Sequence, residues 1–134
     1  MAKRMFSVAI IFALGLSAMD LTLAQAQQRE QVDDQKVEEF LNRHKGSWGS
    51  WNVPYEDGQI LYDLIIDNKY TRALEIGTST GHSGIWMAWA LSKTGGKLIT
   101  IEIDEVRHKE ALKSFEEAGV AAYVDARLAD AHDM

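Results

Sequence analysis

The chain has 134 residues, of which 46% are hydrophobic and 25% are charged, with one proline and no cysteine. This composition is typical of a single globular domain and excludes a low-complexity chain or a disulfide scaffold. The formal net charge is −6 and there is no cluster of lysine or arginine, which argues against a nucleic-acid or anionic-membrane partner.

The first 26 residues have the layout of a secretory signal peptide. Lys3 and Arg4 precede an uncharged, mostly apolar run over residues 5–19, and Ala24-Gln25-Ala26 supplies a small-x-small cleavage pattern. The run is shorter than the roughly 18 to 20 residues that span a bilayer, so we expect no stable membrane anchor. We predict cleavage after Ala26 and export to the periplasm or out of the cell.

The remaining residues predict alternating helices and strands. Residues 27–52 are expected to form a polar leader, an amphipathic helix over 32–44 and an irregular loop that contains Trp48 and Trp51. Asp57 is expected to cap the next helix. The apolar residues of that helix form one stripe: Ile60, Leu61, Leu64 and Ile65.

Three short strands are expected over residues 72–76, 98–103 and 120–126, separated by helices that end at Gly95 and Gly119. This order favours right-handed crossovers and a parallel α/β sheet with helices on its faces. With three strands only, residues 73–76 would form an exposed apolar edge.

Two strand ends carry residues that suit a nucleoside-containing ligand. The first strand leads into Gly77, which lets a ligand approach the backbone, and into the start of a helix, which offers free N–H groups. Glu102 lies near the end of the second strand, where a carboxylate can accept hydrogen bonds from ribose hydroxyls. Ligands of open α/β sheets bind at this edge.

The glycine spacing favours one cofactor over others. A dinucleotide fingerprint needs G-x-G-x-x-G, but Ser79 stands at its second glycine, and no Gly-Lys-Ser/Thr of a P-loop follows. Glu75 adds negative charge that favours a sulfonium cation. S-adenosylmethionine therefore fits better than NAD or ATP, and a nicotinamide-dependent oxidoreductase stays as the less favoured alternative.

The segments 52–59, 74–83 and 98–104 occur in the order that is typical of class I methyltransferases. In particular, they resemble the small O-methyltransferases related to catechol and caffeoyl-CoA O-methyltransferases. The resemblance runs from about Val53 to Ala131. It implies a Rossmann-like fold, with residues 53–134 as a partial S-adenosylmethionine-binding domain truncated after its third strand.

The resemblance also implies a set of cofactor-binding residues. Val53 would contact the methionyl end through its backbone, and Ser83 would bind the methionine carboxylate at a helix start. Glu102 would hold the ribose and Ala131 would lie beside the adenine. The residues that would line the glycine-containing loop are Glu75, Gly77 and Thr78. The family often has tyrosine before the serine, where this chain has His82; we expect this histidine to face solvent or cofactor rather than act as a general base.

In relatives a divalent, magnesium-like metal is held by residues on later strands, so neither a catalytic residue nor a metal ligand is assigned to this chain. We expect methyl transfer to a hydroxyl of a small acceptor, aromatic acceptors included, with weak or no activity in the chain as given. A non-catalytic fragment or cofactor-binding remnant is the alternative. A homodimer is compatible with the resemblance. Trp86 and Trp89 are expected to be core residues.

Overall fold

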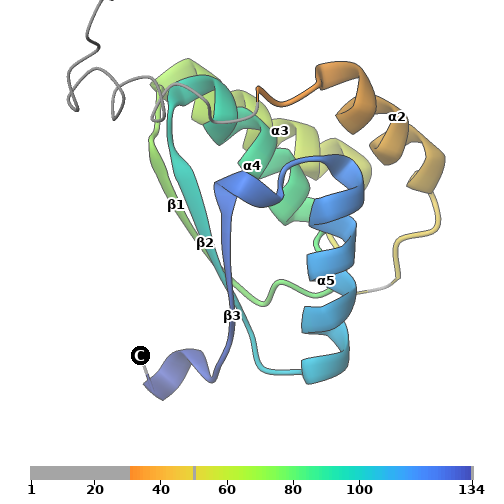
Figure 1. The fold of residues 1–134 in the computed structure, drawn as a ribbon, viewed down its shortest axis with the longest axis vertical. Helices are drawn as coiled ribbons and strands as arrows, with labels where there is room; N and C mark the ends of the chain where they lie inside the picture. Colours follow the sequence, from red (N-terminus) through yellow and green to blue (C-terminus); the bar gives the residue numbers. More distant parts are fainter. Residues whose placement is uncertain (1–30, 50, 134) are drawn as a thin grey trace, which may run out of the picture.

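The computed structural model describes residues 31–49 and 51–133, so the predicted signal peptide lies outside the described residues. The elements in chain order are α2 (Asp34–His44), α3 (Tyr55–Asn68), β1 (Arg72–Ile76), α4 (His82–Thr94), β2 (Lys97–Glu102), α5 (Glu105–Ala118), the 3₁₀ turn η1 (Ala121–Tyr123), β3 (Val124–Leu128) and the 3₁₀ turn η2 (Ala131–Asp133). Figure 1 shows the helices gathered on one side of the sheet.

The three strands form a parallel sheet in the order β1-β2-β3. Right-handed crossovers that advance in one direction place α4 and α5 on the same face. That face presents Ala73, Leu98 and Thr100, whereas Leu74 and Ile76 on the other face are 63% and 68% exposed. The predicted α/β fold and the exposed apolar edge at β1 are therefore confirmed for the described residues.

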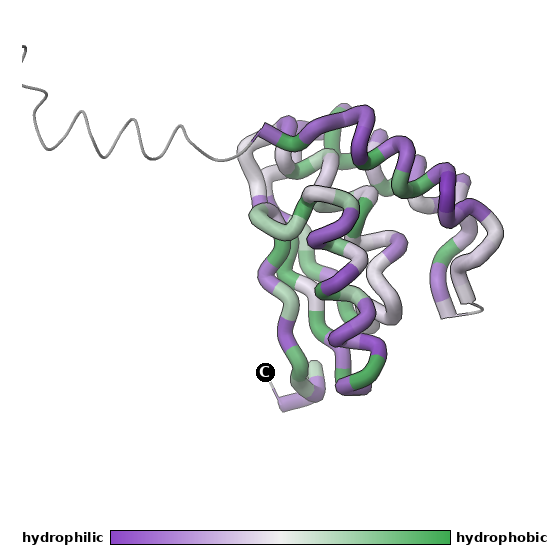
Figure 2. Tube along the Cα trace, turned by 45° about the vertical axis from the view of Figure 1, so that its right-hand side comes forward, coloured by the Kyte–Doolittle hydropathy of each residue, from purple (hydrophilic) through white to green (hydrophobic). Residues whose placement is uncertain are grey.

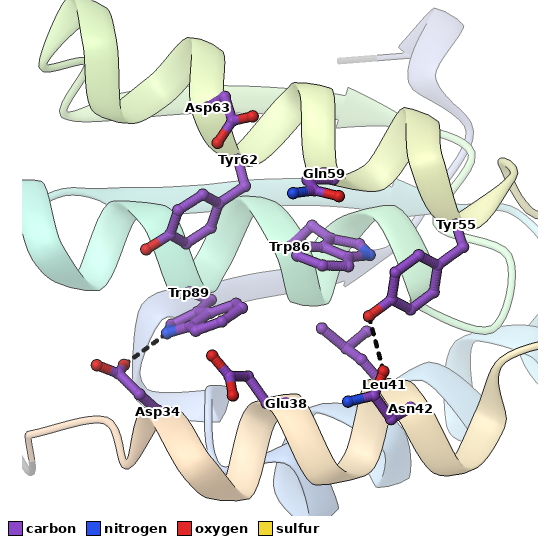
Figure 3. Close-up of a pocket in the computed structure, with 10 residues that line it drawn as sticks. All are labelled: Asp34, Glu38, Leu41, Asn42, Tyr55, Gln59, Tyr62, Asp63, Trp86 and Trp89. Carbon is purple, nitrogen blue, oxygen red and sulfur yellow. Dashed lines mark hydrogen bonds between the residues drawn. The ribbon is translucent and has the colours of Figure 1, made fainter.

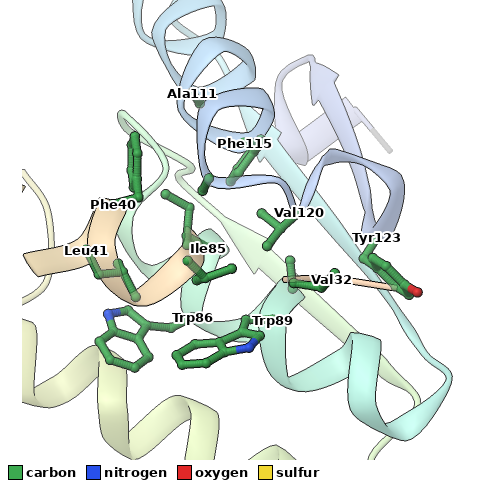
Figure 4. Close-up of a cluster of buried hydrophobic side chains, with 13 residues drawn as sticks. Val32, Phe40, Leu41, Ile85, Trp86, Trp89, Ala111, Phe115, Val120 and Tyr123 are labelled. Carbon is green, nitrogen blue, oxygen red and sulfur yellow. The ribbon is translucent and has the colours of Figure 1, made fainter. Parts of the chain in front are cut away.

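Helix α4 is the centre of the core, because every residue from His82 to Leu91 is buried. On one side it packs against Phe40 and Leu41 of α2, and on another against Phe115 of α5 (Figure 4). Figure 2 shows the hydrophilic residues of α2 and α5 along their outer sides. Trp86 and Trp89 are buried in this cluster, so their prediction as core residues is confirmed.

Helix α3 departs from the prediction in two respects. It begins at Tyr55 directly after Pro54, and Asp57 lies inside the first turn rather than at the cap; proline pre-sets the backbone at a helix start, which moves the boundary upstream. In addition, only part of the predicted apolar stripe is buried. Ile65 is buried, but Ile60 and Leu64 are 56% and 51% exposed, since the described sheet ends at β1.

The third strand starts later than predicted. Residues 121–123 form the turn η1, in which the Tyr123 N–H donates to the Val120 carbonyl, and β3 covers Val124–Leu128. Val120 and Tyr123 are buried, so their apolar character reflects core packing and not strand pairing.

Candidate cofactor-binding site

The loop between β1 and α4 turns on left-handed backbone conformations. Gly77 and Gly81 have φ angles of +88° and +97°, and Ser79 has a φ of +50°. A side chain at Gly81 would press on the ring of Phe115 at 3.1 Å, whereas a Cβ atom at Gly77 would meet nothing within 4 Å. Gly77 therefore borders open space, and a ligand can approach its backbone there.

Glu102, the last residue of β2, holds this loop to the end of the neighbouring strand. One carboxylate oxygen accepts the Ser79 N–H at 2.7 Å, and the other accepts the N–H groups of Ile103 and Asp104 at 3.1 and 3.0 Å. The residue is only 5% exposed. Its carboxylate thus fixes the relative position of the two strand ends that border the open space.

Three of the predicted site residues line one pocket at the carboxyl edge of the sheet. The pocket has a volume of about 250 Å³, and Gly77, Glu102 and Ala131 all contribute to its wall. The remaining lining residues are Ile76, Ile101, Ile103, Ala129, Asp130 and His132. The wall is mostly apolar, with carboxylates at two places, which suits a flat heterocycle joined to a hydroxylated sugar.

Four further polar side chains lie under the loop as one hydrogen-bonded group. The hydroxyls of Ser83 and Thr100 donate to the two oxygens of Glu75 at 2.5 and 2.6 Å. The Thr78 and Thr100 hydroxyls lie 2.5 Å apart. The structure therefore brings the predicted residues Glu75, Thr78 and Ser83 together through Thr100. The sequence analysis missed Thr100; its signal is a polar residue two positions before Glu102, on the same face of β2.

Burial raises the pKa of Glu75, its bonds to Ser83 and Thr100 oppose that rise, and the nearby Glu102 charge adds to it. The raised folded-state pKa means that Glu75 contributes stability below its ordinary pKa of 4.5, and that this contribution is lost as pH rises through the folded value. We predict that Glu75→Gln raises the unfolding free energy at pH 7.5, with a smaller gain at pH 4. Urea denaturation at both values measures this, with the exposed Glu105→Gln as control; equal gains at both values would contradict it.

Val53 and His82 are hydrogen-bonded to each other, although they lie 29 positions apart in the sequence. The Nδ1 atom of His82 lies 2.9 Å from the Val53 carbonyl oxygen, and its Nε2 lies 3.2 Å from Trp86 Nε1. His82 is fully buried, so the expectation that it faces solvent or cofactor is wrong. An imidazole with polar partners on both nitrogens is satisfied inside the core, which a sequence pattern does not reveal.

The two loop tryptophans differ in their surroundings. Trp48 stacks on His82 with ring centroids 4.5 Å apart and 17° between the planes. Trp51 is 75% exposed, and the Arg107 guanidinium lies 5.3 Å from its ring centroid. Trp48 is thus a packing residue, whereas the Trp51 ring is largely open to solvent.

A larger pocket, of about 410 Å³, lies between α2, α3 and α4 (Figure 3). It is bordered by aromatic rings that include Tyr62 and Trp89. Asp34 accepts from Trp89 Nε1 at 2.7 Å and pairs with Lys93. This pocket is lined by helix residues alone and shares no lining residue with the pocket at the sheet edge, so we assign it to the packing of α2.

Within residues 31–49 and 51–133, no three His, Asp or Glu side chains are gathered so that they could hold a metal ion. In the same residues no helix is long and apolar enough to cross a membrane.

A family model described as O-methyltransferase matches residues 22–134. The chain belongs to this family of S-adenosylmethionine-dependent enzymes. It is 44% identical over 83 residues to a catechol O-methyltransferase of Niastella koreensis, covering 62% of this chain and 37% of that protein. It is 29% identical over 99 residues to caffeoyl-CoA O-methyltransferase 1 of Arabidopsis thaliana, covering 74% and 37%.

Solved structures support the same family and the Rossmann-like fold. An O-methyltransferase from Bacillus cereus in complex with SAH matches with a TM-score of 0.62 and 28% identity, over 84% of this chain and 51% of that one. An O-methyltransferase structure from Klebsiella pneumoniae matches with a TM-score of 0.62 and 33% identity, over 87% and 52%. The chain therefore spans about half the length of these structures and less than half of the sequence relatives.

Proposed function

We propose that residues 53–133 of this O-methyltransferase family member bind S-adenosylmethionine at the carboxyl edge of the sheet. The observation that carries the proposal is the meeting of Gly77, Glu102 and Ala131 in one pocket. Glu75, two residues before Gly77, bonds to Ser83 at the start of α4. The cofactor-bound relative from Bacillus cereus supports it.

Each residue has a separate part in this binding. Ala131 and the apolar wall receive the adenine, and Glu102 has lone pairs left for the ribose hydroxyls beyond the three N–H groups that it accepts. The open space at Gly77 admits the ligand close to the backbone. Glu75 and Ser83 face the amino-acid end, and the Val53 carbonyl borders it. When bound, S-adenosylmethionine supplies an activated methyl group on its sulfonium.

We further propose that the whole reaction is methylation of a hydroxyl group on a small acceptor, with aromatic acceptors included. The names of the catechol and caffeoyl-CoA relatives support this class. The chain covers 37% of each of those relatives. Transfer of a labelled methyl group to catechol separates an active enzyme from a cofactor-binding remnant.

Filling the sheet-edge pocket tests the proposed site. We expect the 134-residue chain to bind S-adenosylhomocysteine in isothermal titration, and Ala131→Phe to lower the affinity at least tenfold because the ring occupies the adenine space. Ala121→Phe places the same ring at an exposed position of turn η1 and is expected to leave affinity unchanged. Absence of binding by the unaltered chain would overturn the proposal, and tighter binding of NADH would favour the nicotinamide alternative.

Export is proposed on the N-terminal pattern alone. Fractionation of a tagged chain, with N-terminal sequencing of the exported form, is expected to find Gln27 as the first residue. A chain that keeps Met1 and stays with the cytoplasmic fraction would contradict export. The homodimer stays a prediction, which light scattering measures.

A further inference from the structure

His82 is a buried imidazole whose two nitrogens have opposite roles. A carbonyl oxygen can only accept, so Nδ1 must donate its proton to Val53 at 2.9 Å. The indole N–H of Trp86 can only donate, so Nε2 must accept at 3.2 Å. The surroundings therefore fit one species, the neutral imidazole with its proton on Nδ1.

Through these contacts His82 connects two parts of the molecule that are distant in sequence, the loop between α2 and α3 and the start of α4. Its ring stacks on Trp48 and its Nδ1 binds the Val53 carbonyl, both in that loop, and its backbone begins α4. A second bond joins the loop to the glycine-containing loop before α4, because the Asn52 side-chain amide donates to the Thr80 hydroxyl at 2.9 Å. The Asn52–Val53 segment is thus attached to the glycine-containing loop at two adjacent points.

We propose that His82 is a positioning residue for cofactor binding, which in its neutral Nδ1–H form holds the Val53 backbone beside the glycine-containing loop. This inference rests on the proposed function, in which Val53 borders the methionyl end. His82 itself does not contact the cofactor; it acts through Val53 and Trp48. It also sets the position of Ser83, the next residue of α4, which bonds to Glu75.

Protonation of His82 would place a second ring N–H against the N–H of Trp86, so the contact would become repulsive. Burial lowers the pKa of His82, while its bond to Val53 opposes that effect. Few titratable side chains of the neighbouring elements lie near His82 or near the residues that it contacts. The ring centroid of Tyr55 in α3 lies 6.1 Å from that of His82, and His44 of α2 packs near Trp48. Glu75 of β1 bonds to Ser83, and Glu110 and Lys113 of α5 line the same pocket as Trp48. In the described residues none of them bonds to His82, so no carboxylate stabilises an imidazolium.

The effect of His82 on stability depends on pH with a definite sign. A histidine whose folded pKa lies below its unfolded value of about 6.5 contributes stability above pH 6.5 that is lost as pH falls through 6.5 toward the folded value. If His82 positions Val53, the cofactor affinity of the folded molecules falls when the pH falls through the folded pKa, where His82 takes up its proton. A purely structural histidine would change stability there without changing the affinity of the molecules that stay folded.

Two variants of His82 separate these roles. His82→Phe keeps a flat ring for Trp48 but removes both hydrogen bonds, and we expect a tenfold loss of affinity for S-adenosylhomocysteine at pH 8. In His82→Gln the amide can donate to Val53 and accept from Trp86, so we expect affinity within threefold of the unaltered chain. We expect this variant to bind equally at pH 8 and at a pH below the one at which the imidazole ¹⁵N spectra show His82 half-protonated, whereas the unaltered chain binds several-fold more weakly at the lower pH.

His44→Gln is the matched control, because the His44 ring also lies near Trp48, with centroids 5.8 Å apart, and its Nδ1 bonds to the Phe40 carbonyl rather than to Val53. It is expected to keep the pH dependence. Circular dichroism checks that each variant is folded at both pH values, and ¹⁵N spectra of the imidazole report which nitrogen carries the proton. The inference is overturned if folded His82→Phe binds as tightly as the unaltered chain, or if Nε2 is protonated at pH 8. Failure of the unaltered chain to bind would instead refute the proposed function.

Discussion

Replacing Glu102 with glutamine is expected to lower the free energy of unfolding by about 3 kcal/mol and to abolish measurable binding of S-adenosylhomocysteine. The carboxylate accepts three backbone N–H groups, from Ser79, Ile103 and Asp104. An amide of the same shape offers one oxygen, and its NH₂ group meets N–H donors. A buried donor left without a partner costs about 1 to 3 kcal/mol, and the backbone would move to relieve the contact.

Glu105→Gln is the control for this change, since Glu105 is an exposed glutamate three residues away whose bond is to Lys109 on the same helix. Exposed pairs of this kind contribute about 0.3 to 0.5 kcal/mol, so we expect little effect. Urea denaturation measures both variants, and titration is carried out on protein that is folded by circular dichroism. A Glu102→Gln chain with unchanged stability would show that the three N–H groups do not depend on the carboxylate.

The behaviour of Glu102 shows which part of the site the sequence could predict. A carboxylate at the end of the second parallel strand follows from strand patterning and topology, and the pocket beside Gly77 is where topology places it. The bond from the Ser79 N–H could not be predicted, because it depends on the left-handed backbone at Ser79. Local patterns indicate which residues occupy a strand end but not how a loop closes over it.

The same division holds for the fold. Helix α4 was predictable from an apolar run that ends at Gly95, whose left-handed conformation closes the helix. The start of α3 is set locally, by Pro54. The burial of His82 was not predictable, because it depends on a contact between segments far apart in the chain, in which His82 bonds to the Val53 carbonyl.

The need for glycine at position 58 also depends on a residue far away in the chain, and Gly58→Ala is expected to destabilise the protein by about 2 kcal/mol. A Cβ atom at Gly58 would lie 2.2 Å from Cδ1 and 2.3 Å from Nε1 of Trp86. Alanine favours a helix over glycine by about 1 kcal/mol, but overpacking of a core costs about 1 to 3 kcal/mol and more when the neighbour cannot move. Here the indole is held in place, because it is buried and donates to His82.

Gly49→Ala is the control for this change, because a Cβ atom there would meet nothing within 4 Å; we expect no loss of stability. Urea denaturation gives both values, and a double-mutant cycle assigns the cause. In a Trp86→Leu background the indole is absent, so the cost of Gly58→Ala should fall to near zero or become a gain from helix propensity. An equal cost in both backgrounds would place the strain elsewhere in α3. A smaller destabilisation in the Trp86→Leu background would show that glycine is required at position 58 so that α3 can approach the Trp86 indole. The same indole donates to His82, which in turn binds the Val53 carbonyl.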